Sequence, residues 1–199
     1  MNKGFYRFAR ALARPVIYLL YWYKFEGREN LEYDGKMLIY ANHLSFMDVV
    51  FIGLADRHFL SFMAKKELFR NKLFGKILEW LGAFPVDRDA GGLAAMNKAC
   101  NILNDGHPLM IFPEGTRNLK DEEIGEFHPG VTMMAIRTDS PVLPIIITHR
   151  PKKFRRNIVK IGKPIPIKDL MEEGVSRTQN NRIVTAKLKD ILNGMKEQE

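Results

Sequence analysis

A histidine and an aspartate five residues apart, His43 and Asp48, give the clearest chemical signal in this sequence. The apolar run at residues 37–41 predicts a buried strand that ends just before the histidine. Ser45, followed three residues later by an acid and then by an apolar run, is typical of a helix start with the serine as N-cap. Positions five apart on one helix point about 140° away from each other. The two side chains therefore meet only if a turn lies between them, and we expect the ring of His43 to fold back onto Asp48.

Such a pair is suited to general-base chemistry. An aspartate hydrogen-bonded to one imidazole nitrogen fixes the tautomer and stabilises the imidazolium. The other ring nitrogen is then free to take a proton from an alcohol. The residues alone also allow a structural interpretation, in which Asp48 only completes a capping box and His43 ends a strand with its hydrogen bonds satisfied.

Three further short blocks follow in order along the chain. They are Gly82–Arg88 (GAFPVDR), Phe112–Arg117 (FPEGTR) and Val142–Ile145 (VLPI). Together with Asn42–Asp48 (NHLSFMD) they resemble the motifs of the glycerolipid acyltransferases, which carry the pattern N-H-x-x-x-x-D. The sequence resembles in particular the 1-acyl-sn-glycerol-3-phosphate acyltransferase (lysophosphatidic acid acyltransferase) family, over roughly residues 35–165. Asn118 stands where serine is usual in this family.

The resemblance implies transfer of a fatty acyl group from a thioester donor, either acyl-CoA or acyl carrier protein. The acceptor would be the sn-2 hydroxyl of 1-acyl-sn-glycerol 3-phosphate, and the product phosphatidic acid. By motif position, His43 would be the general base and Asp48 its orienting partner. A thioester is already activated, so the reaction needs no acyl-enzyme. No serine lies in a Gly-x-Ser-x-Gly elbow, and Cys100, the single cysteine, has no obvious base near it in the sequence.

The remaining motif positions imply contacts with the substrate. The acceptor site would include Gly82, Phe84 and Arg88, with Arg88 on the phosphate. The glycerol backbone and its phosphate would be positioned by Glu114, Gly115, Thr116 and Arg117, and Pro144 would shape the acyl pocket. Arginine presents a permanently charged fork that suits a phosphate, although ion pairs of either arginine with nearby acids are an equally good reading of the sequence. The five histidines show no paired ligand spacing, so we expect no metal and no cofactor.

The composition indicates a folded domain with an anionic partner. The chain has 199 residues and a formal net charge of +8. No zinc-finger spacing, glycine-rich RNA motif or evident recognition helix accompanies the charge, so we expect a membrane surface and anionic lipid rather than nucleic acid. A basic cluster follows the strand predicted at residues 142–148 and consists of Arg150, Lys152, Lys153, Arg155 and Arg156. It would bind lipid headgroups, the phosphates of coenzyme A or an acidic carrier protein, or it would simply be a solvated loop.

Residues 1–24 predict an amphipathic helical segment at the membrane interface, and residues 25–199 the acyltransferase domain. The helix should carry its basic residues on one face and its apolar residues opposite, and Pro15 should kink or restart it. The basic residues are Lys3, Arg7, Arg10 and Arg14, and the apolar ones include Phe5, Phe8 and Leu12. The apolar run at 16–23 is shorter than the ~20 residues that span a bilayer. We therefore expect a peripheral protein on the cytoplasmic face of a bacterial cell membrane, the alternative being a helix docked on its own domain.

Alternating apolar runs and helical patterns predict an α/β fold with a mixed, mostly parallel central sheet flanked by helices. The expected strands lie near residues 37–41, 59–64, 82–88, 109–112, 142–148 and 158–161, the last at the sheet edge. A single helix is expected over residues 65–82. In such sheets, sites form beyond the carboxyl ends of the strands, and both His43 and Glu114 directly follow strands.

Two other activities remain open at this stage. The protein would acylate glycerol 3-phosphate or another lysolipid by the same mechanism, or it would be a non-catalytic lipid-binding module that keeps the fold and the basic surface. The presence of both His43 and Asp48 disfavours the second.

Overall fold

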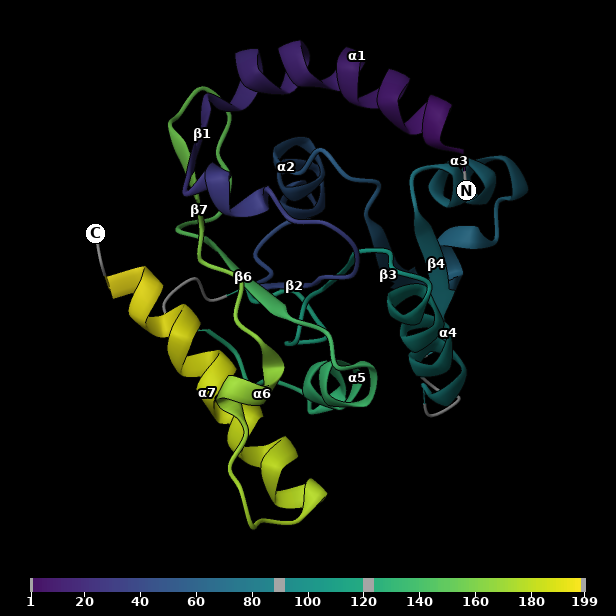
Figure 1. Cartoon of the computed structure of the whole chain (residues 1–199). Coiled ribbons are helices and arrows are strands. Elements are labelled where there is room, and N and C mark those ends of the chain that lie inside the picture. The colour runs from purple at the N-terminus through teal and green to yellow at the C-terminus, as the bar shows by residue number, and fades with distance from the viewer. Residues whose placement is uncertain (1, 88–91, 120–123, 198–199) are drawn as a thin grey trace.

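A seven-stranded sheet forms the centre of the computed structural model, which describes residues 2–87, 92–119 and 124–197 (Figure 1). The strands are β1 (Tyr23–Glu26), β2 (Leu38–Ala41), β3 (Ser61–Lys65), β4 (Ala83–Val86), β5 (Leu109–Ile111), β6 (Val142–Ile147) and β7 (Asn157–Ile161). Their order across the sheet is β1-β7-β6-β2-β5-β3-β4. Neighbouring strands are parallel except for the antiparallel pair β6 and β7. The predicted mixed, mostly parallel α/β sheet is confirmed.

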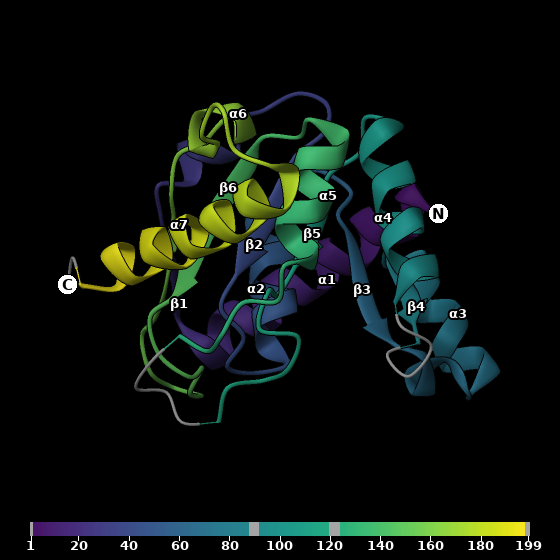
Figure 2. The same ribbon diagram turned by 90° about the horizontal axis from the view of Figure 1, so that it is seen from below.

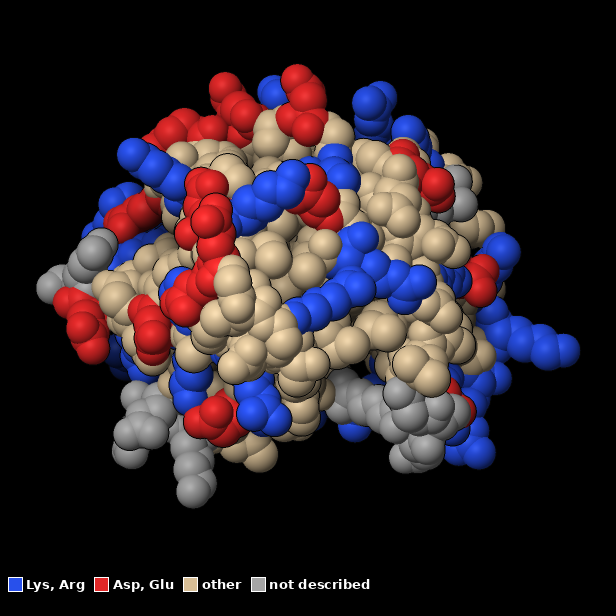
Figure 3. Space-filling model, turned by 60° about the horizontal axis from the view of Figure 1, so that its bottom comes forward, with Lys and Arg blue, Asp and Glu red and all other residues tan. Residues whose placement is uncertain are grey.

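Helices cover both faces of this sheet (Figures 1 and 2). The helices are α1 (Lys3–Tyr21), α2 (Met47–Ala55), α3 (Lys72–Trp80), α4 (Leu93–Asn104), α5 (Gly130–Thr138), α6 (Ile167–Leu170) and α7 (Arg177–Glu197), with 3-10 turns η1 (Arg28–Leu31) and η2 (Lys66–Phe69). Helix α2 lies against one face with α1 outside it, and α4, α5 and α7 cover the other. On the α4–α7 side, acidic and basic side chains are interspersed (Figure 3).

The position of β2 in the middle of the sheet explains why its sequence is a continuous apolar run. All four of its residues are fully buried. Leu38 and Tyr40 belong to the core shared with α4, α5 and α7, whereas Ile39 and Ala41 belong to the core shared with α2. Successive side chains of a strand point to opposite faces, so a strand that feeds two cores must be apolar at every position.

Two expectations about elements are wrong. Strand β7 is not at the sheet edge, because β1 pairs with it in parallel outside it. A four-residue strand is too short for its periodicity to separate it from the preceding apolar helix, which ends where Trp22 adopts a left-handed φ of 42°. The single helix expected over residues 65–82 is instead η2 followed by α3. The side chain of Asn71 accepts a hydrogen bond from the N–H of Phe74 at 3.0 Å and starts the second helix.

Helix α1 is one element, whereas Pro15 was expected to kink or restart it. It continues through Pro15. Arg10 and Arg14 donate hydrogen bonds of 3.3 Å to the carbonyl oxygen of Leu54 in the last turn of α2, and Arg10 also donates to that of Arg57, just beyond the helix, at 3.1 Å. The last carbonyls of a helix carry partial negative charge, which favours guanidinium groups there. The outer side is left with exposed apolar side chains, namely Phe8, Leu12, Val16, Tyr18 and Leu19.

Candidate active site

His43 and Asp48 meet across the turn between β2 and α2, as the spacing predicts. The Nδ1 atom of His43 lies 2.9 Å from the Oδ2 atom of Asp48. The aspartate side chain is fully buried, whereas the histidine side chain is 16% exposed. The pair therefore has its orienting end inside the protein and its imidazole at the surface of the site.

The same carboxylate also holds the backbone of the turn that leads into α2. Its Oδ2 atom accepts hydrogen bonds of 2.6 Å from the backbone N–H groups of Leu44 and Ser45. The Oγ atom of Ser45 accepts a bond of 3.2 Å from the N–H of Met47, although the N-cap of α2 is Phe46, one residue after the predicted serine, and has no side-chain cap bond. The structural and chemical interpretations of Asp48 therefore both apply, because one buried oxygen holds the turn and the imidazole together.

A second segment, which follows β5, holds the histidine turn from the other side. Strands β2 and β5 are neighbours and parallel, so their carboxyl ends lie at the same edge of the sheet. The ring of Phe112 stacks on the imidazole of His43, with centroids 3.9 Å apart and planes 14° from parallel. The N–H of His43 donates to Oε1 of Glu114 at 2.7 Å, and its carbonyl oxygen accepts from the N–H of Asn118 at 2.7 Å. Sequence reasoning did not assign these positioning contacts of Phe112 and Asn118.

Glu114 is buried, and its carboxylate accepts hydrogen bonds from backbone N–H groups of two loops. Besides His43, it accepts a hydrogen bond from the N–H of Gly125, whose distance to Oε2 is 3.0 Å. A Cβ atom at position 125 would lie 2.6 Å from that oxygen, so glycine is needed there for the backbone to approach. Burial raises the pKa of Glu114, while the hydrogen bonds from the N–H groups of His43 and Gly125 act in the opposite direction.

Replacing Glu114 by glutamine is expected to remove a pH dependence from the free energy of unfolding. With a folded-state pKa above the ordinary carboxyl value of 4.5, the folded protein keeps the proton to a higher pH than the unfolded chain does. Glu114 therefore makes the wild-type protein less stable as the pH rises above the ordinary carboxyl pKa of 4.5. In Glu114→Gln the side chain does not titrate, so this contribution is absent. Urea unfolding between about pH 4 and pH 7 should show the difference in stability, wild type minus variant, falling with pH. A difference that grows with pH would contradict the raised pKa.

The next three residues bring a cation to the histidine turn. Gly115 has a left-handed φ of 65°, and a Cβ atom there would lie 2.8 Å from the ring of His128. Thr116 and Arg117 are exposed. The guanidinium carbon of Arg117 lies 4.0 Å from the ring centroid of Phe46, a residue of the histidine motif. Stacking uses the face of the guanidinium and leaves its N–H groups, which lie in the plane, directed outward.

The other predicted site residues lie farther along the sheet or outside the described residues. Gly82 is at the amino end of β4, where a Cβ atom would lie 2.1 Å from the carbonyl oxygen of Leu60. Phe84 is buried in the core, and Pro144 is buried within β6 opposite Tyr40. These contacts give packing reasons for the residue types, and the predicted roles in substrate binding stay predictions. Arg88 falls in the range that the structure does not describe.

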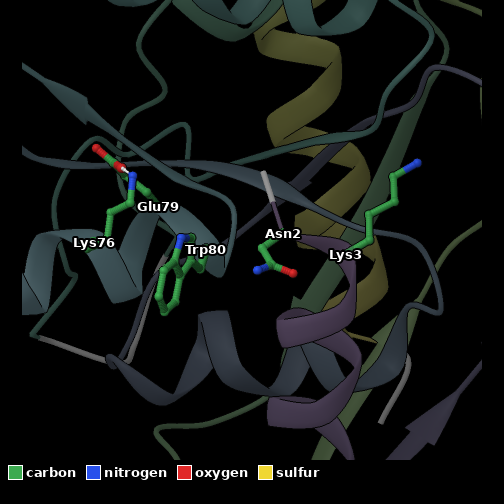
Figure 4. A pocket seen from close by; sticks show the side chains of 5 residues that line it. All are labelled: Asn2, Lys3, Lys76, Glu79 and Trp80. Carbon is green, nitrogen blue, oxygen red and sulfur yellow. Dashed lines mark hydrogen bonds and ion pairs between the residues drawn. The ribbon is translucent and has the colours of Figure 1, made fainter.

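An open hollow elsewhere on the molecule is separate from these residues. It lies between the start of α1 and the end of α3, and Figure 4 shows its lining side chains, Asn2, Lys3, Lys76, Glu79 and Trp80. Lys76 and Glu79 form an ion pair of 3.1 Å there. None of these residues belongs to the histidine motif or to the Phe112–Arg117 segment, so the hollow is not where the His43 pair would act.

A cysteine and clusters of possible metal ligands are the other places where reactive groups are usually found. Cys100 is buried in the core, and burial raises the pKa of its thiol. Among residues 2–87, 92–119 and 124–197, no group of three or more His, Cys, Asp or Glu side chains is placed to hold a metal ion.

Fold and site together define an acyltransferase, and the comparison with known families agrees. The family model described as Acyltransferase matches residues 23–148, and this chain belongs to that family. It is 31% identical to the 1-acyl-sn-glycerol-3-phosphate acyltransferase of Bacillus subtilis over 166 residues. The matched region covers 80% of this chain and 82% of that protein. It is also 31% identical to the enzyme of the same name from Streptococcus pneumoniae, over 76% of this chain and 59% of that protein.

The fold is that of a solved relative. The crystal structure of the 1-acyl-sn-glycerophosphate (LPA) acyltransferase from Thermotoga maritima superposes with a TM-score of 0.73 and 24% identity, covering 99% of this chain and 80% of that one. In length, the chain spans most of the Bacillus relative and about half of the Helicobacter pylori relative of the same name, 52% of which it covers.

Proposed function

We propose that this protein is a 1-acylglycerol-3-phosphate O-acyltransferase that converts lysophosphatidic acid to phosphatidic acid. The observation that carries the proposal is the His43–Asp48 contact of 2.9 Å at the carboxyl edge of the sheet. Membership of the acyltransferase family and the names of the relatives support the reaction and the acceptor.

His43 acts on the acceptor hydroxyl through the ring nitrogen that Asp48 does not contact. Nε2 takes the proton of the sn-2 hydroxyl as the oxygen attacks the carbonyl carbon of the thioester. Asp48 stabilises the imidazolium that forms. When the tetrahedral intermediate collapses, the carbon–sulfur bond breaks and the imidazolium returns the proton to the leaving thiolate. The new ester and the free thiol then leave, and His43 is neutral again.

Arg117 is the described residue best placed for the acceptor phosphate. It is exposed, and its contact with Phe46 brings it to the same turn as His43. A guanidinium binds a phosphate by paired, charge-assisted hydrogen bonds, which would fix the glycerol backbone relative to the base. Thr116 and Gly115 stand beside it, and Arg88 keeps the phosphate role that the family resemblance implies.

The direct test is transfer of a labelled acyl group by the purified protein. Three acceptors should be compared, namely 1-acyl-sn-glycerol 3-phosphate, glycerol 3-phosphate and lysophosphatidylcholine, with coenzyme A and acyl carrier protein thioesters as donors. We expect phosphatidic acid from the first acceptor and little product from the other two. A preference for glycerol 3-phosphate would contradict the acceptor, and no transfer from either donor to any acceptor would contradict the reaction.

We also propose that the protein works as a peripheral protein on the cytoplasmic face of the membrane, where both candidate donors are found. No helix within the described residues is long and apolar enough to cross a membrane. The outer face of α1 is apolar, and an edge-to-face contact of 5.1 Å between Phe5 and Trp80 joins it to α3. Helix α3 adds the exposed side chains of Leu73 and Phe74. An apolar face flanked by basic residues is typical of a helix that lies in a membrane interface.

Replacing Leu12 and Leu19 together by glutamine is expected to weaken binding to anionic vesicles by about tenfold or more. The two side chains are 63% and 69% exposed, so their loss removes apolar area from the membrane contact without opening the core. Glutamine also keeps a high helix propensity. Cosedimentation with vesicles measures the effect. Leu93→Gln is the matched control, because Leu93 is 65% exposed but lies on α4, across the sheet; equal losses in both variants would refute the proposal for α1.

A further inference from the structure

The loop between β6 and β7 combines basic and aromatic side chains at the surface. Four basic residues and one aromatic residue in it are exposed, namely Lys152, Lys153, Phe154, Arg155 and Arg156. The side chain of Phe154 is 61% exposed. Figure 1 shows this loop, in green, beside the carboxyl end of α1.

Backbone hydrogen bonds attach the loop to the end of α1. The N–H of Phe154 donates to the carbonyl oxygen of Leu20 at 2.6 Å, and the N–H of Asn157 donates to that of Trp22 at 3.3 Å. The side-chain amide of Asn157 also donates to the carbonyl oxygen of Tyr21. Three successive carbonyls at the end of α1 are thus bonded to this loop, so loop and helix present one continuous surface.

Buried Asn157 fixes the shape of the loop from inside. It is 1% exposed. Its Oδ1 atom accepts from the N–H of Lys152 at 2.9 Å, and its Nδ2 atom donates to the carbonyl oxygens of Lys152 and Arg155 at 3.0 and 2.7 Å. One buried side chain thus binds three backbone groups of the loop, and the side chains of residues 152–156 are exposed.

Two large aromatic side chains stand out where the loop meets the helix. Phe154 and Trp22 both have left-handed backbone conformations, with φ of 55° and 42°. Such conformations cost free energy for residues with a Cβ atom. The side chains of Trp22 and Phe154 are 52% and 61% exposed, so neither ring is fully buried within the chain. Aromatic rings with basic neighbours are typical of residues that sit at the membrane–water interface.

We infer that the β6–β7 loop is a second membrane contact, in which Phe154 enters the interface and Lys152, Lys153, Arg155 and Arg156 bind anionic headgroups. A lipid surface fits better than an acidic carrier protein because the basic residues continue directly into the apolar outer face of α1. On the α4–α7 side, the basic side chains are instead interspersed with acidic ones, as Figure 3 shows.

The contact would also orient the active site. Strands β2 and β6 are parallel neighbours, so the loop after β6 leaves the sheet at the same edge as His43. Arg150, at the start of the loop, donates to the carbonyl oxygen of Asn118 at 3.1 Å, and Asn118 bonds the backbone of His43. A membrane bound by this loop and α1 therefore lies beside the turn that carries the base. The inference extends the membrane contact proposed for α1.

Binding to vesicles that contain no acyl donor or acceptor tests the loop independently of the reaction. Phe154→Asn removes the ring while keeping a residue that tolerates the left-handed backbone, and should weaken binding to phosphatidylglycerol vesicles about tenfold. A basic side chain near an anionic membrane strengthens binding about fivefold, so Lys152→Glu with Lys153→Glu should weaken it on the order of 25-fold or more. Arg177→Glu with Arg182→Glu makes the same charge change on α7 and should have a much smaller effect.

A fluorescent label measures insertion at the position itself. Cys100 is buried, so an environment-sensitive thiol dye attached to Phe154→Cys reports on the loop. Its emission should shift to the blue on addition of phosphatidylglycerol vesicles, whereas a label on Leu93→Cys should not respond. If the loop variants bind vesicles like the wild type while the Leu12 and Leu19 variant does not, the loop contact is wrong and α1 binds alone. If the loop variants raise only the Michaelis constant for acyl carrier protein, the partner is the carrier.

Discussion

Replacing His43 by alanine is expected to lower kcat about 10²- to 10⁴-fold, because a positioned general base contributes that much. The fold should survive the change, since Asp48 would still bind the N–H groups of Leu44 and Ser45 in the turn before α2. The loss should appear in kcat more than in KM, because the base acts on the proton in the transition state and not on the phosphate or the acyl chain. Circular dichroism of the same preparation checks that the variant is folded.

A second histidine–aspartate pair provides the matched control. At the other end of α2, Nδ1 of His58 lies 2.6 Å from Oδ1 of buried Asp56, and the Oη–H of Tyr33 donates to Oδ2 at 2.5 Å. This pair precedes β3, at the amino edge of the sheet. His58→Ala should leave kcat within a few-fold of the wild type at temperatures where the variant is folded. Activity that survives His43→Ala but is lost in His58→Ala would reverse the assignment.

The contacts of His43 show which parts of the site the sequence can predict and which it cannot. The His43–Asp48 contact was predictable because the strand, the serine cap and the acid are local signals within a few residues. The contact between the N–H of His43 and Glu114 joins residues 71 positions apart, and a side chain bound to a backbone group has no sequence pattern. The hydrogen bonds of Arg10 and Arg14 to backbone carbonyls likewise depend on where α2 ends in space.

The same distinction applies to the sheet. Strands such as β2 and β6 were predicted because strands buried on both faces are apolar throughout. Strand β1 was missed because it is four residues long and follows an apolar aromatic helix without a break in composition. Gly82 fitted an acceptor-site motif, yet its φ of 97° and its close approach to the carbonyl oxygen of Leu60 appear only when β3 and β4 are paired.

Replacing Asp48 by asparagine is expected to lower kcat by a similar factor, on the order of 10²- to 10⁴-fold, with little loss of structure. Three N–H groups converge on Oδ2, those of the imidazole, Leu44 and Ser45. An asparagine must therefore turn its amide oxygen to that position, because an NH₂ group there would face only donors. The Nδ1–H tautomer of His43 would be kept. What is lost is the negative charge that stabilises the imidazolium as it forms.

Asp48→Ala separates this electrostatic effect from the structural one. Alanine removes the acceptor altogether, and each buried donor left without a partner costs about 1–3 kcal/mol of stability. Urea unfolding should therefore rank the wild type, Asp48→Asn and Asp48→Ala in that order of stability, with the larger step at alanine. Turnover should already have fallen at asparagine. If Asp48→Asn keeps wild-type turnover while Asp48→Ala loses both stability and turnover, the carboxylate only holds the turn together, and His43 works as a base without the charge beside it.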